Sequence, residues 1–214
     1  MPATGYHPGM TEPFDPGTLS FYAREAVDYA TRRPLAGDHQ LQPFLARLPA
    51  GARILELGAG AGRDAERTIA QGFDLDPTDA VPELAAEAEA RIGRPVRIMR
   101  FDELEAQAAY DAVWANASLH HAPATALPAI LARVHRALKP GGWHFANYKA
   151  ANGDHAGGGR DFLGRYYNYP SQAQLTAAYD AAGPWAELDV EPYEDGTYGG
   201  GLIPWLAVTA RKPD

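Results

Sequence analysis

A run of alternating glycines, with an acid about one strand later, is the part of this chain whose residue types could do chemistry. Gly58, Gly60 and Gly62 directly follow the mostly apolar segment 54–57, and Asp79 comes 21 positions after Gly58, at the end of the next predicted strand. Glycines in such a turn let the backbone approach a ligand, and an acid at the end of the next strand can accept hydrogen bonds from ribose hydroxyls. The spacing therefore predicts a nucleotide-type site.

The position of the third glycine separates two ligand classes. A dinucleotide-binding turn has glycine at its first, third and sixth positions. The sixth position here is Arg63, and the third glycine is Gly62 instead. A nicotinamide-dependent oxidoreductase is therefore the weaker interpretation of this turn.

The elements that must position this turn alternate between strand and helix. Apolar runs predict strands over 52–58, 73–78, 95–101, 110–117, 143–149, 185–193 and 203–211. Helical periodicity and end signals predict helices over 18–33, 38–48, 63–71, 82–92, 124–138 and 171–182. The last two strands lack a crossover helix and should pair antiparallel. The order predicts an α/β fold with a Rossmann-like, seven-stranded, mostly parallel sheet, an antiparallel last strand, helices on both faces and an N-terminal helical cap.

Four features follow one another at consistent spacings: the glycine turn, Asp79, segment 110–113 (Tyr-Asp-Ala-Val) and segment 138–142 (Leu-Lys-Pro-Gly-Gly). This set resembles the class I S-adenosylmethionine (SAM) dependent methyltransferases over about 50–149. Within that superfamily the chain is most similar to the small bacterial tellurite-resistance-type methyltransferases. The residues that carry this narrower likeness are 62–64 (Gly-Arg-Asp), 72–79 (Gly-Phe-Asp-Leu-Asp-Pro-Thr-Asp) and the pair Tyr148-Lys149.

The resemblance implies SAM as the cofactor and S-adenosylhomocysteine as the product of an in-line methyl transfer. The implied cofactor residues are Tyr22, Glu56, Gly58, Ala59, Gly60, Gly62, Arg63, Asp79, Ala80, Phe101, Asp102, Leu104 and Asn116. Asp79 is preferred as the ribose-binding acid because aligning Gly72 with the usual strand start places Asp74 and Asp76 in mid-strand. For Phe101 and Asp102, adenine contacts and plain structural roles are about equally good interpretations.

The predicted catalytic residues are His121, Tyr148, Lys149 and Arg165. His121 stands where the resemblance places an acceptor-facing histidine, and it is either a base or orienter, or a hydrogen-bonded wall residue. A metal site at His120-His121 is disfavoured because adjacent side chains point apart. For Tyr22, on the predicted N-terminal helix, two interpretations stay open: it covers the cofactor, or it only packs this helix against the rest of the protein. A soft nucleophile needs no base, whereas a hydroxyl or amine would need one.

The Gly-rich and Tyr-rich segment 157–169 is expected to form a lid that is mobile without ligand and ordered with it. In this hypothesis Lys149, Arg160 and Arg165 grip an anionic acceptor. The alternative is a segment packed permanently on the sheet edge, with tyrosines covering the core and arginines in solvent.

Composition limits the class of partner. The 214 residues carry a net charge of −8 with no run of basic residues, which disfavours nucleic acid as the acceptor and favours a small molecule. The absence of cysteine fits a cytoplasmic protein, and neither an export signal nor an apolar run of membrane length is seen.

The expected organisation is a single methyltransferase domain over 1–214. It divides into a flexible tail (1–17), a helical cap (18–48), a SAM-binding core (50–149), and a lid loop with C-terminal strands (150–214). A SAM-binding sensor that does not turn over is the alternative from another class. The sequence does not predict the oligomeric state or the identity of the acceptor.

Overall fold

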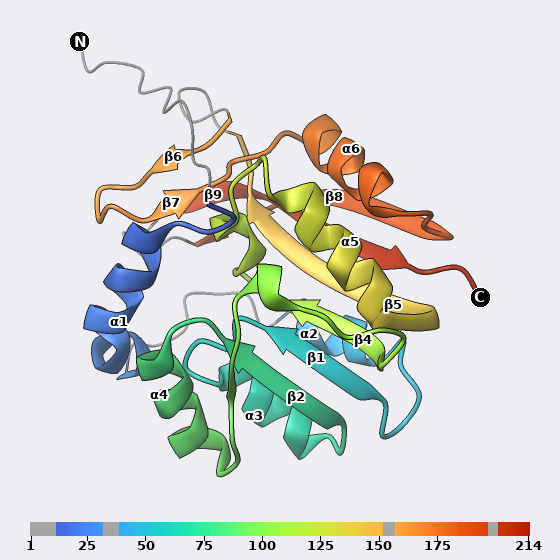
Figure 1. The fold of residues 1–214 in the computed structure, drawn as a ribbon, viewed down its shortest axis with the longest axis horizontal. Coiled ribbons are helices and arrows are strands. Elements are labelled where there is room, and N and C mark those ends of the chain that lie inside the picture. Colours follow the sequence, from blue (N-terminus) through green and yellow to red (C-terminus); the bar gives the residue numbers. More distant parts are fainter. Residues whose placement is uncertain (1–11, 32–38, 152–156, 197–200) are drawn as a thin grey trace.

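The computed structural model describes residues 12–31, 39–151, 157–196 and 201–214. Its main sheet has seven strands in the order β3-β2-β1-β4-β5-β9-β8 (Figure 1). The strands are β1 Arg53–Leu57, β2 Asp74–Asp79, β3 Arg97–Ile98, β4 Tyr110–Ala115, β5 Leu138–Lys149, β8 Glu187–Gly196 and β9 Leu202–Arg211. The pairs among β1 to β5 are parallel, whereas β9 pairs antiparallel with both β5 and β8. The predicted fold class is confirmed.

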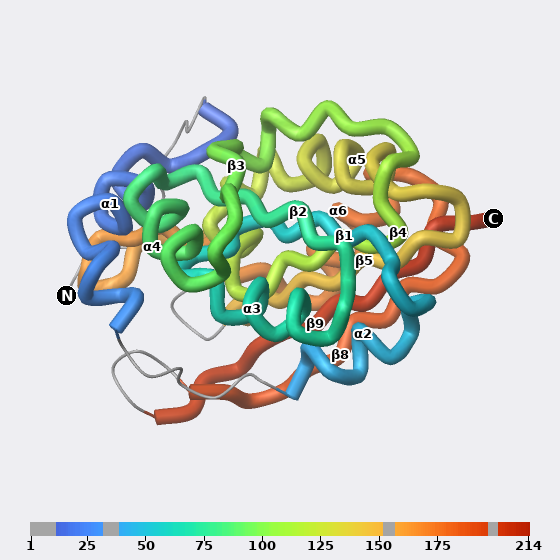
Figure 2. The backbone as a smooth tube through the Cα atoms, turned by 90° about the horizontal axis from the view of Figure 1, so that it is seen from below, coloured from blue at the N-terminus to red at the C-terminus, as the bar shows by residue number. Residues whose placement is uncertain are grey.

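Helices cover both faces of this sheet (Figure 2). Their bounds are α1 Pro16–Thr31, α2 Leu41–Leu45, α3 Arg63–Ala70, α4 Pro82–Ile92, α5 Leu127–Ala137 and α6 Gln172–Ala182, with short 3-10 turns η1 Phe101–Glu103 and η2 Leu119–His121. Helices α5 and α6 bury their apolar faces in the larger core cluster, whereas α2 and α3 pack on the opposite face. Helix α1 contacts α4 and lies beyond the sheet edge.

The helix ends follow local sequence signals. Helix α4 begins with Pro82 in its first turn and ends at Ile92, as the sequence predicts, and Gly93 follows it with φ of 67°. At the start of α6, Ser171 and Gln174 form a reciprocal capping box. Helix α1 begins at Pro16, two residues before its predicted start, because Asp15 accepts the Thr18 amide at 2.7 Å and caps the helix.

Two predicted boundaries in the sheet differ from the structure. The strand expected over 95–101 is reduced to Arg97–Ile98, because the chain turns into η1 at Phe101. Strand β5 begins at Leu138, before the expected turn at 139–142, and its pairing with β4 is irregular there. Gly141 has φ of 70°, so the left-handed residue bends the strand without ending it.

A second, two-stranded sheet follows β5. Its strands are β6 Gly159–Arg160 and β7 Tyr166–Tyr167, and residues 159–167 are called the hairpin below. Figures 1 and 2 both show it beside α1, far along the chain from that helix. The carboxyl ends of β1, β2 and β4 lie at one edge of the sheet, the usual position of a ligand site in an open α/β sheet. Within the described ranges, no helix has the length and apolar character to cross a membrane.

Candidate functional site

A pocket of about 740 Å³, counting its solvent-open part, lies at the carboxyl edge of β1, β2 and β4. Eight of the predicted site residues line it: Tyr22, Gly58, Gly60, Asp79, Ala80, Phe101, Asp102 and His121. The fold therefore brings residues from five separate segments of the chain together at one concave site.

Gly58 and Gly60 both have a backbone conformation that favours glycine, and both have a neighbouring side chain close to where a Cβ would lie. Gly58 has φ of 82°, and a Cβ there would lie 2.6 Å from the Cβ of Ser118. Gly60 has φ of 54°, and a Cβ there would lie 3.4 Å from the ring of Tyr29. Any side chain would therefore strain the backbone at either position and intrude on the pocket wall.

Asp79 lies at the end of β2 and is 6% exposed. Its carboxylate accepts the amide of Gly60 at 2.8 Å and that of Val81 at 2.9 Å. Burial raises the pKa of Asp79 to about 6, and the backbone amides oppose that rise only in part. Asp79 therefore joins the glycine turn to the pocket and keeps a desolvated carboxylate on its wall.

The two competing acids lie elsewhere, as the alignment argument predicts. Asp74 has a side chain 67% exposed and pairs with Arg53 at 3.7 Å. Asp76 accepts from Arg97 at 2.9 Å and from the hydroxyl of Tyr110. Neither lines the pocket.

Glu56 lies behind the glycine turn, outside the pocket lining. It is 3% exposed, and its Oε2 has no hydrogen-bond partner among the described residues. Burial, then the charges of Asp64 and Asp79, raise the pKa of Glu56 well above its ordinary value. A buried carboxyl with an unused oxygen fits a role in holding a cationic ligand group, directly or through water.

The adenine side of the predicted site is formed by η1. Phe101 and Asp102 line the pocket, and Asp102 accepts from Arg100 Nε at 3.0 Å. The guanidinium of Arg100 lies 4.6 Å from the ring centroid of Phe14, which also lines the pocket. The carboxylate that was expected to meet the ligand is therefore already in an ion pair.

Three of the predicted cofactor residues lie outside the pocket lining and hold the glycine turn from outside, so their contact with the cofactor stays a prediction. Arg63 donates to the carbonyls of Tyr29 and Ala30 at the end of α1, at 3.3 and 3.2 Å. Gly62 and Ala59 face α4, since a Cβ on Gly62 would lie 3.0 Å from Ala88 and Ala59 packs in the same cluster. These residues position the turn and α1 instead of lining the pocket.

Leu104 and Asn116 are also outside the pocket, for packing reasons. Leu104 is 1% exposed and belongs to the main core. Asn116 donates to Asp64 at 2.9 Å and accepts from Asn147 at 2.8 Å, so it ties β4 to α3 and β5. Neither is placed to contact a ligand in this pocket.

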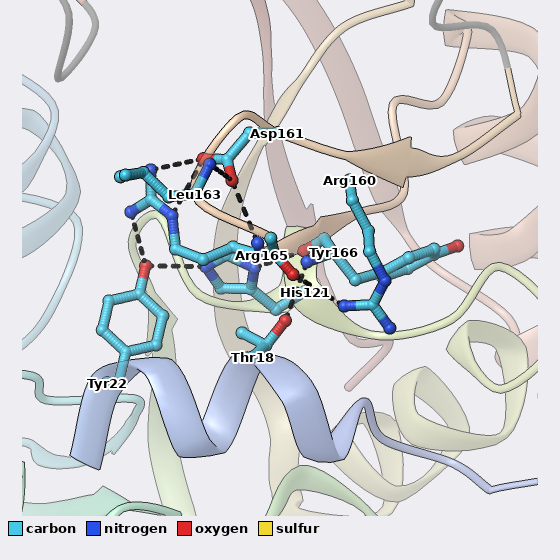
Figure 3. A network of polar contacts seen from close by, with 9 residues as sticks. Thr18, Tyr22, His121, Arg160, Asp161, Leu163, Arg165 and Tyr166 are labelled. Carbon is cyan, nitrogen blue, oxygen red and sulfur yellow. Dashed lines mark hydrogen bonds and ion pairs between the residues drawn. The ribbon is translucent and has the colours of Figure 1, made fainter. Parts of the chain in front are cut away.

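The other end of the pocket is a network of side chains on α1, η2 and the hairpin (Figure 3). Arg165 Nη1 lies 3.2 Å from the hydroxyl of Tyr22, and that hydroxyl lies 3.0 Å from His121 Nε2. His121 Nδ1 lies 2.6 Å from the carbonyl of Tyr166. Because a carbonyl only accepts, Nδ1 carries the proton, and Nε2 accepts the hydroxyl proton of Tyr22.

This network makes His121 a weak base. Burial lowers the pKa of His121 to about 3, and the charges of Arg165 and Lys149 act in the same direction. The imidazole is therefore neutral at physiological pH, and the lone pair on its Nε2 accepts the hydrogen bond from Tyr22. Of the two predicted roles, orienting fits this geometry better than proton abstraction.

One ion pair fixes the hairpin to the start of α1, and a second lies within the hairpin. Arg160 pairs with Asp15, with Nη1 2.9 Å from Oδ1, and Arg165 pairs with Asp161 at 2.7 Å. Asp15 and Arg165 are almost fully buried. The expectation that Arg160 and Arg165 grip the acceptor is corrected, because both guanidinium groups are held by carboxylates of the chain itself.

Tyr148 and Lys149 end on opposite sides of β5. Tyr148 is fully buried, and its hydroxyl lies 3.3 Å from that of Tyr179 in the core beneath α6. Its predicted catalytic role is therefore corrected to a packing role. Lys149 lies outside the pocket lining, with Nζ 3.8 Å from the ring centroid of Tyr167.

The sequence interpretation missed the residues just before α1. Pro13, Phe14, Asp15 and Thr18 line the pocket, although 1–17 was expected to be a tail. An Asp followed by Pro is a signal for a helix start, and it would have moved the boundary to 16. Residues 1–11 of the expected tail and 152–156 of the expected lid loop lie outside the described residues.

Comparison with known proteins gives one family and several relatives. A family model described as a methyltransferase domain matches residues 29–183. The ubiquinone biosynthesis O-methyltransferase of Xanthomonas axonopodis pv. citri (strain 306) is 34% identical over 111 residues, which are 48% of this chain and 46% of that protein. The chain thus spans about half the length of the curated relatives it matches.

Two solved structures extend the likeness over most of the chain. A 1,6-didemethyltoxoflavin-N1-methyltransferase of Burkholderia thailandensis, with bound 1,6-didemethyltoxoflavin and S-adenosylhomocysteine, matches with a TM-score of 0.68 and 26% identity. The match covers 92% of this chain and 87% of that one. Phosphoethanolamine N-methyltransferase 2 of Haemonchus contortus, in complex with S-adenosyl-L-methionine, has a TM-score of 0.66 at 18% identity over 92% and 57%, a likeness of fold.

Proposed function

The chain belongs to the methyltransferase-domain family, and from this premise we propose that it transfers a methyl group from SAM to a small, planar organic acceptor. The observation that carries the proposal is that one pocket holds Gly58, Gly60 and Asp79 at one end and the Tyr22–His121 pair at the other. The first set fits a nucleoside, and the second faces the position of a reacting group.

In this proposal Asp79 binds the ribose hydroxyls, and the glycine turn lies against the amino-acid part of SAM. The unpaired oxygen of Glu56 supports a role in holding the ligand's ammonium group, directly or through one water. Phe101 and Asp102 face the base. SAM supplies an activated methyl group whose sulfonium needs no protonation to leave.

The protein's main contribution is then alignment of donor and acceptor and exclusion of water. Tyr22 and Tyr29 pack edge to face at 5.5 Å and close the pocket from α1. An aromatic face attracts a cation, so these rings suit the neighbourhood of a sulfonium. His121 and Tyr22 orient the acceptor through their fixed hydrogen bond.

The class of acceptor is supported by both the pocket and the relatives. Phe14, Leu19 and Leu84 give the pocket apolar walls. The relatives are named for methylating ubiquinone precursors and a toxoflavin precursor, which are small molecules. The narrower likeness to tellurite-resistance-type enzymes would give a chalcogen oxyanion instead. Its motif residues Arg63 and Asp64 contact α1 and β4, so they support the fold of the turn and do not select an acceptor.

The test has two stages, because a sensor and an enzyme share the same cofactor site. Calorimetry with SAM and with S-adenosylhomocysteine measures binding, and mass spectrometry of SAM incubations with a panel of phenols and N-heterocycles measures turnover. We expect binding of both and methylated product from at least one ring compound. Binding without any product would favour the sensor, and no binding would overturn the proposal.

A further inference from the structure

Two buried side-chain nitrogens beside the hairpin have no hydrogen-bond partner among the described residues. Nδ1 of His120, which is 3% exposed, and Nε1 of Trp205, which is 7% exposed, have no partner in the described part of the chain. An indole N–H is only a donor, so burying it unpaired costs the fold its desolvation energy. Such a cost is usually offset by a function or by a bound molecule.

A cation lies with them. Nζ of Lys149 is 3.8 Å from the ring centroid of Tyr167 and 5.9 Å from that of Trp205. Among the described residues, Lys149 makes ring contacts and no ion pair. Asp161, the acid of the hairpin, is already engaged by Arg165 at 2.7 Å. We call His120, Lys149 and Trp205 the donor cluster.

The fold holds these three residues together. Lys149 and Trp205 are opposite each other in the antiparallel pairing of β5 with β9. The ring of His120 lies 5.5 Å from that of Trp205 and 4.9 Å from that of Tyr167. Strands, η2 and the hairpin therefore bring three nitrogen groups that are able to donate a hydrogen bond, together with flat aromatic walls, to one place.

The donor cluster adjoins the pocket. His121 lines the pocket, and its ring is 4.4 Å from that of His120 and 4.5 Å from that of Tyr167. Burial lowers the pKa of Lys149 to about 8, and the nearby charge of Arg165 acts in the same direction. At neutral pH the ammonium is still mostly protonated, so the surroundings are electropositive.

On these contacts, and resting on the proposed function, we propose that the donor cluster binds an ionised oxygen of the methyl acceptor. The acceptor is then a flat aromatic or heteroaromatic compound with an acidic hydroxyl or an enolisable carbonyl, and Tyr167 and Trp205 lie against its ring.

Because the donor cluster binds an acceptor that is already ionised, the reaction needs no general base, a role for which His121 is too weakly basic. The donors select the acceptor after it has lost its proton to solvent. A lone pair of the anion, on that oxygen or on a conjugated atom, forms the bond to the methyl carbon. The carbon–sulfur bond breaks with its electron pair going to sulfur, and no proton has to move in the step.

The test uses 4-nitrophenol, which ionises near neutral pH with a visible colour change, and 4-nitroanisole, the same ring with its oxygen blocked. Both are titrated into the protein saturated with S-adenosylhomocysteine. We expect 4-nitrophenol to bind with its absorption shifted toward the phenolate, and 4-nitroanisole to bind at least tenfold more weakly.

Lys149→Met and Trp205→Phe should each weaken 4-nitrophenolate binding about tenfold or more and reverse the colour shift, with unchanged affinity for S-adenosylhomocysteine. Trp143→Phe, at the opposite end of β5, is the matched control. Lys149→Met keeps the test valid if Trp205→Phe fails to fold. Equal binding of the two probes by the parent, or unaltered phenolate binding by Lys149→Met, would overturn the inference. A parent that does not bind S-adenosylhomocysteine would instead overturn the proposed function itself.

Discussion

The glycine-turn end of the pocket is built mainly from backbone close in sequence, whereas the hairpin end is built from side chains of distant segments. At the first end, residues 58–62 and Asp79 belong to consecutive elements, and their key contacts are backbone amides. At the second end, Tyr22 meets His121 across 99 positions, and Arg165 meets Tyr22 across 143. The glycine-turn end suits a ligand that is the same in all relatives, such as a cofactor, and the hairpin end suits an acceptor that differs between relatives.

The largest effect should come from placing a side chain in the glycine turn. Gly60→Val puts a branched side chain at φ of 54° and against Tyr29, and it disturbs the amide held by Asp79. We expect loss of S-adenosylhomocysteine binding by about 4 kcal/mol or more, measured by calorimetry, in a protein that still folds.

Gly72→Ala is the control for backbone strain. It has φ of 85° with nothing within 4 Å of the new Cβ, so it should lower stability by about 1 kcal/mol and leave binding unchanged. A folded Gly60→Val protein with parental affinity would place the cofactor elsewhere.

The next largest effect should come from removing the acid at the end of β2. Asp79→Ala should weaken SAM binding by roughly 2–4 kcal/mol, because two charge-assisted hydrogen bonds to a ribose are lost. Asp74→Ala, at an exposed position outside the pocket, should bind like the parent. If the two variants exchanged these outcomes, the strand register used here would be wrong.

At the hairpin end, Arg165→Met should lower the stability of the protein and loosen the packing of the hairpin against α1. It removes the partner of Asp161, whose side chain is only 12% exposed, and the donor to Tyr22. We expect the free energy of unfolding to fall by about 2–3 kcal/mol and amide exchange over 159–167 to speed up. Arg24→Met, at an exposed pair, should change stability by less than about 0.5 kcal/mol.

The same exchange experiment addresses the lid. The Arg160–Asp15 ion pair and the hydrogen bond from Arg165 to Tyr22 support a hairpin that is held closed, whereas the sequence predicts one that closes on ligand. Equal, strong protection of 159–167 with and without S-adenosylhomocysteine would make the hairpin a fixed wall. Protection that appears only with ligand would make it a lid.

The smallest effect should be the pH dependence of cofactor binding. Asp79 must be ionised to accept from ribose, and its pKa is raised to about 6. Affinity for S-adenosylhomocysteine should therefore fall about tenfold between pH 7.5 and pH 5. The stability of the ligand-free protein should change in the opposite direction. Because the pKa of Asp79 is higher in the folded than in the unfolded chain, the free energy of unfolding falls as the pH rises from about 4 through 6. Asp79→Asn should remove the slope in affinity.

The difference between the two ends also explains what the sequence could predict. The glycines, Asp79 and the order of strands are local signals, so the sheet and the cofactor end follow from them. The sequence could not predict the partner of Arg165, because Asp161, Tyr22 and an anionic acceptor are all chemically able to accept a hydrogen bond from its guanidinium group. Tyr148 and Lys149 were predicted together, yet strand alternation sends one into the core and the other to the edge.

The central claim is that one pocket joins a cofactor end to an acceptor end at the Tyr22–His121 pair. A crystal structure with S-adenosylhomocysteine tests this claim most directly. We expect the ribose hydroxyls on the carboxylate of Asp79 and the sulfur facing Tyr22 and His121. Density for the ribose at Asp76 or at the donor cluster, or a sulfur turned away from His121, would contradict it.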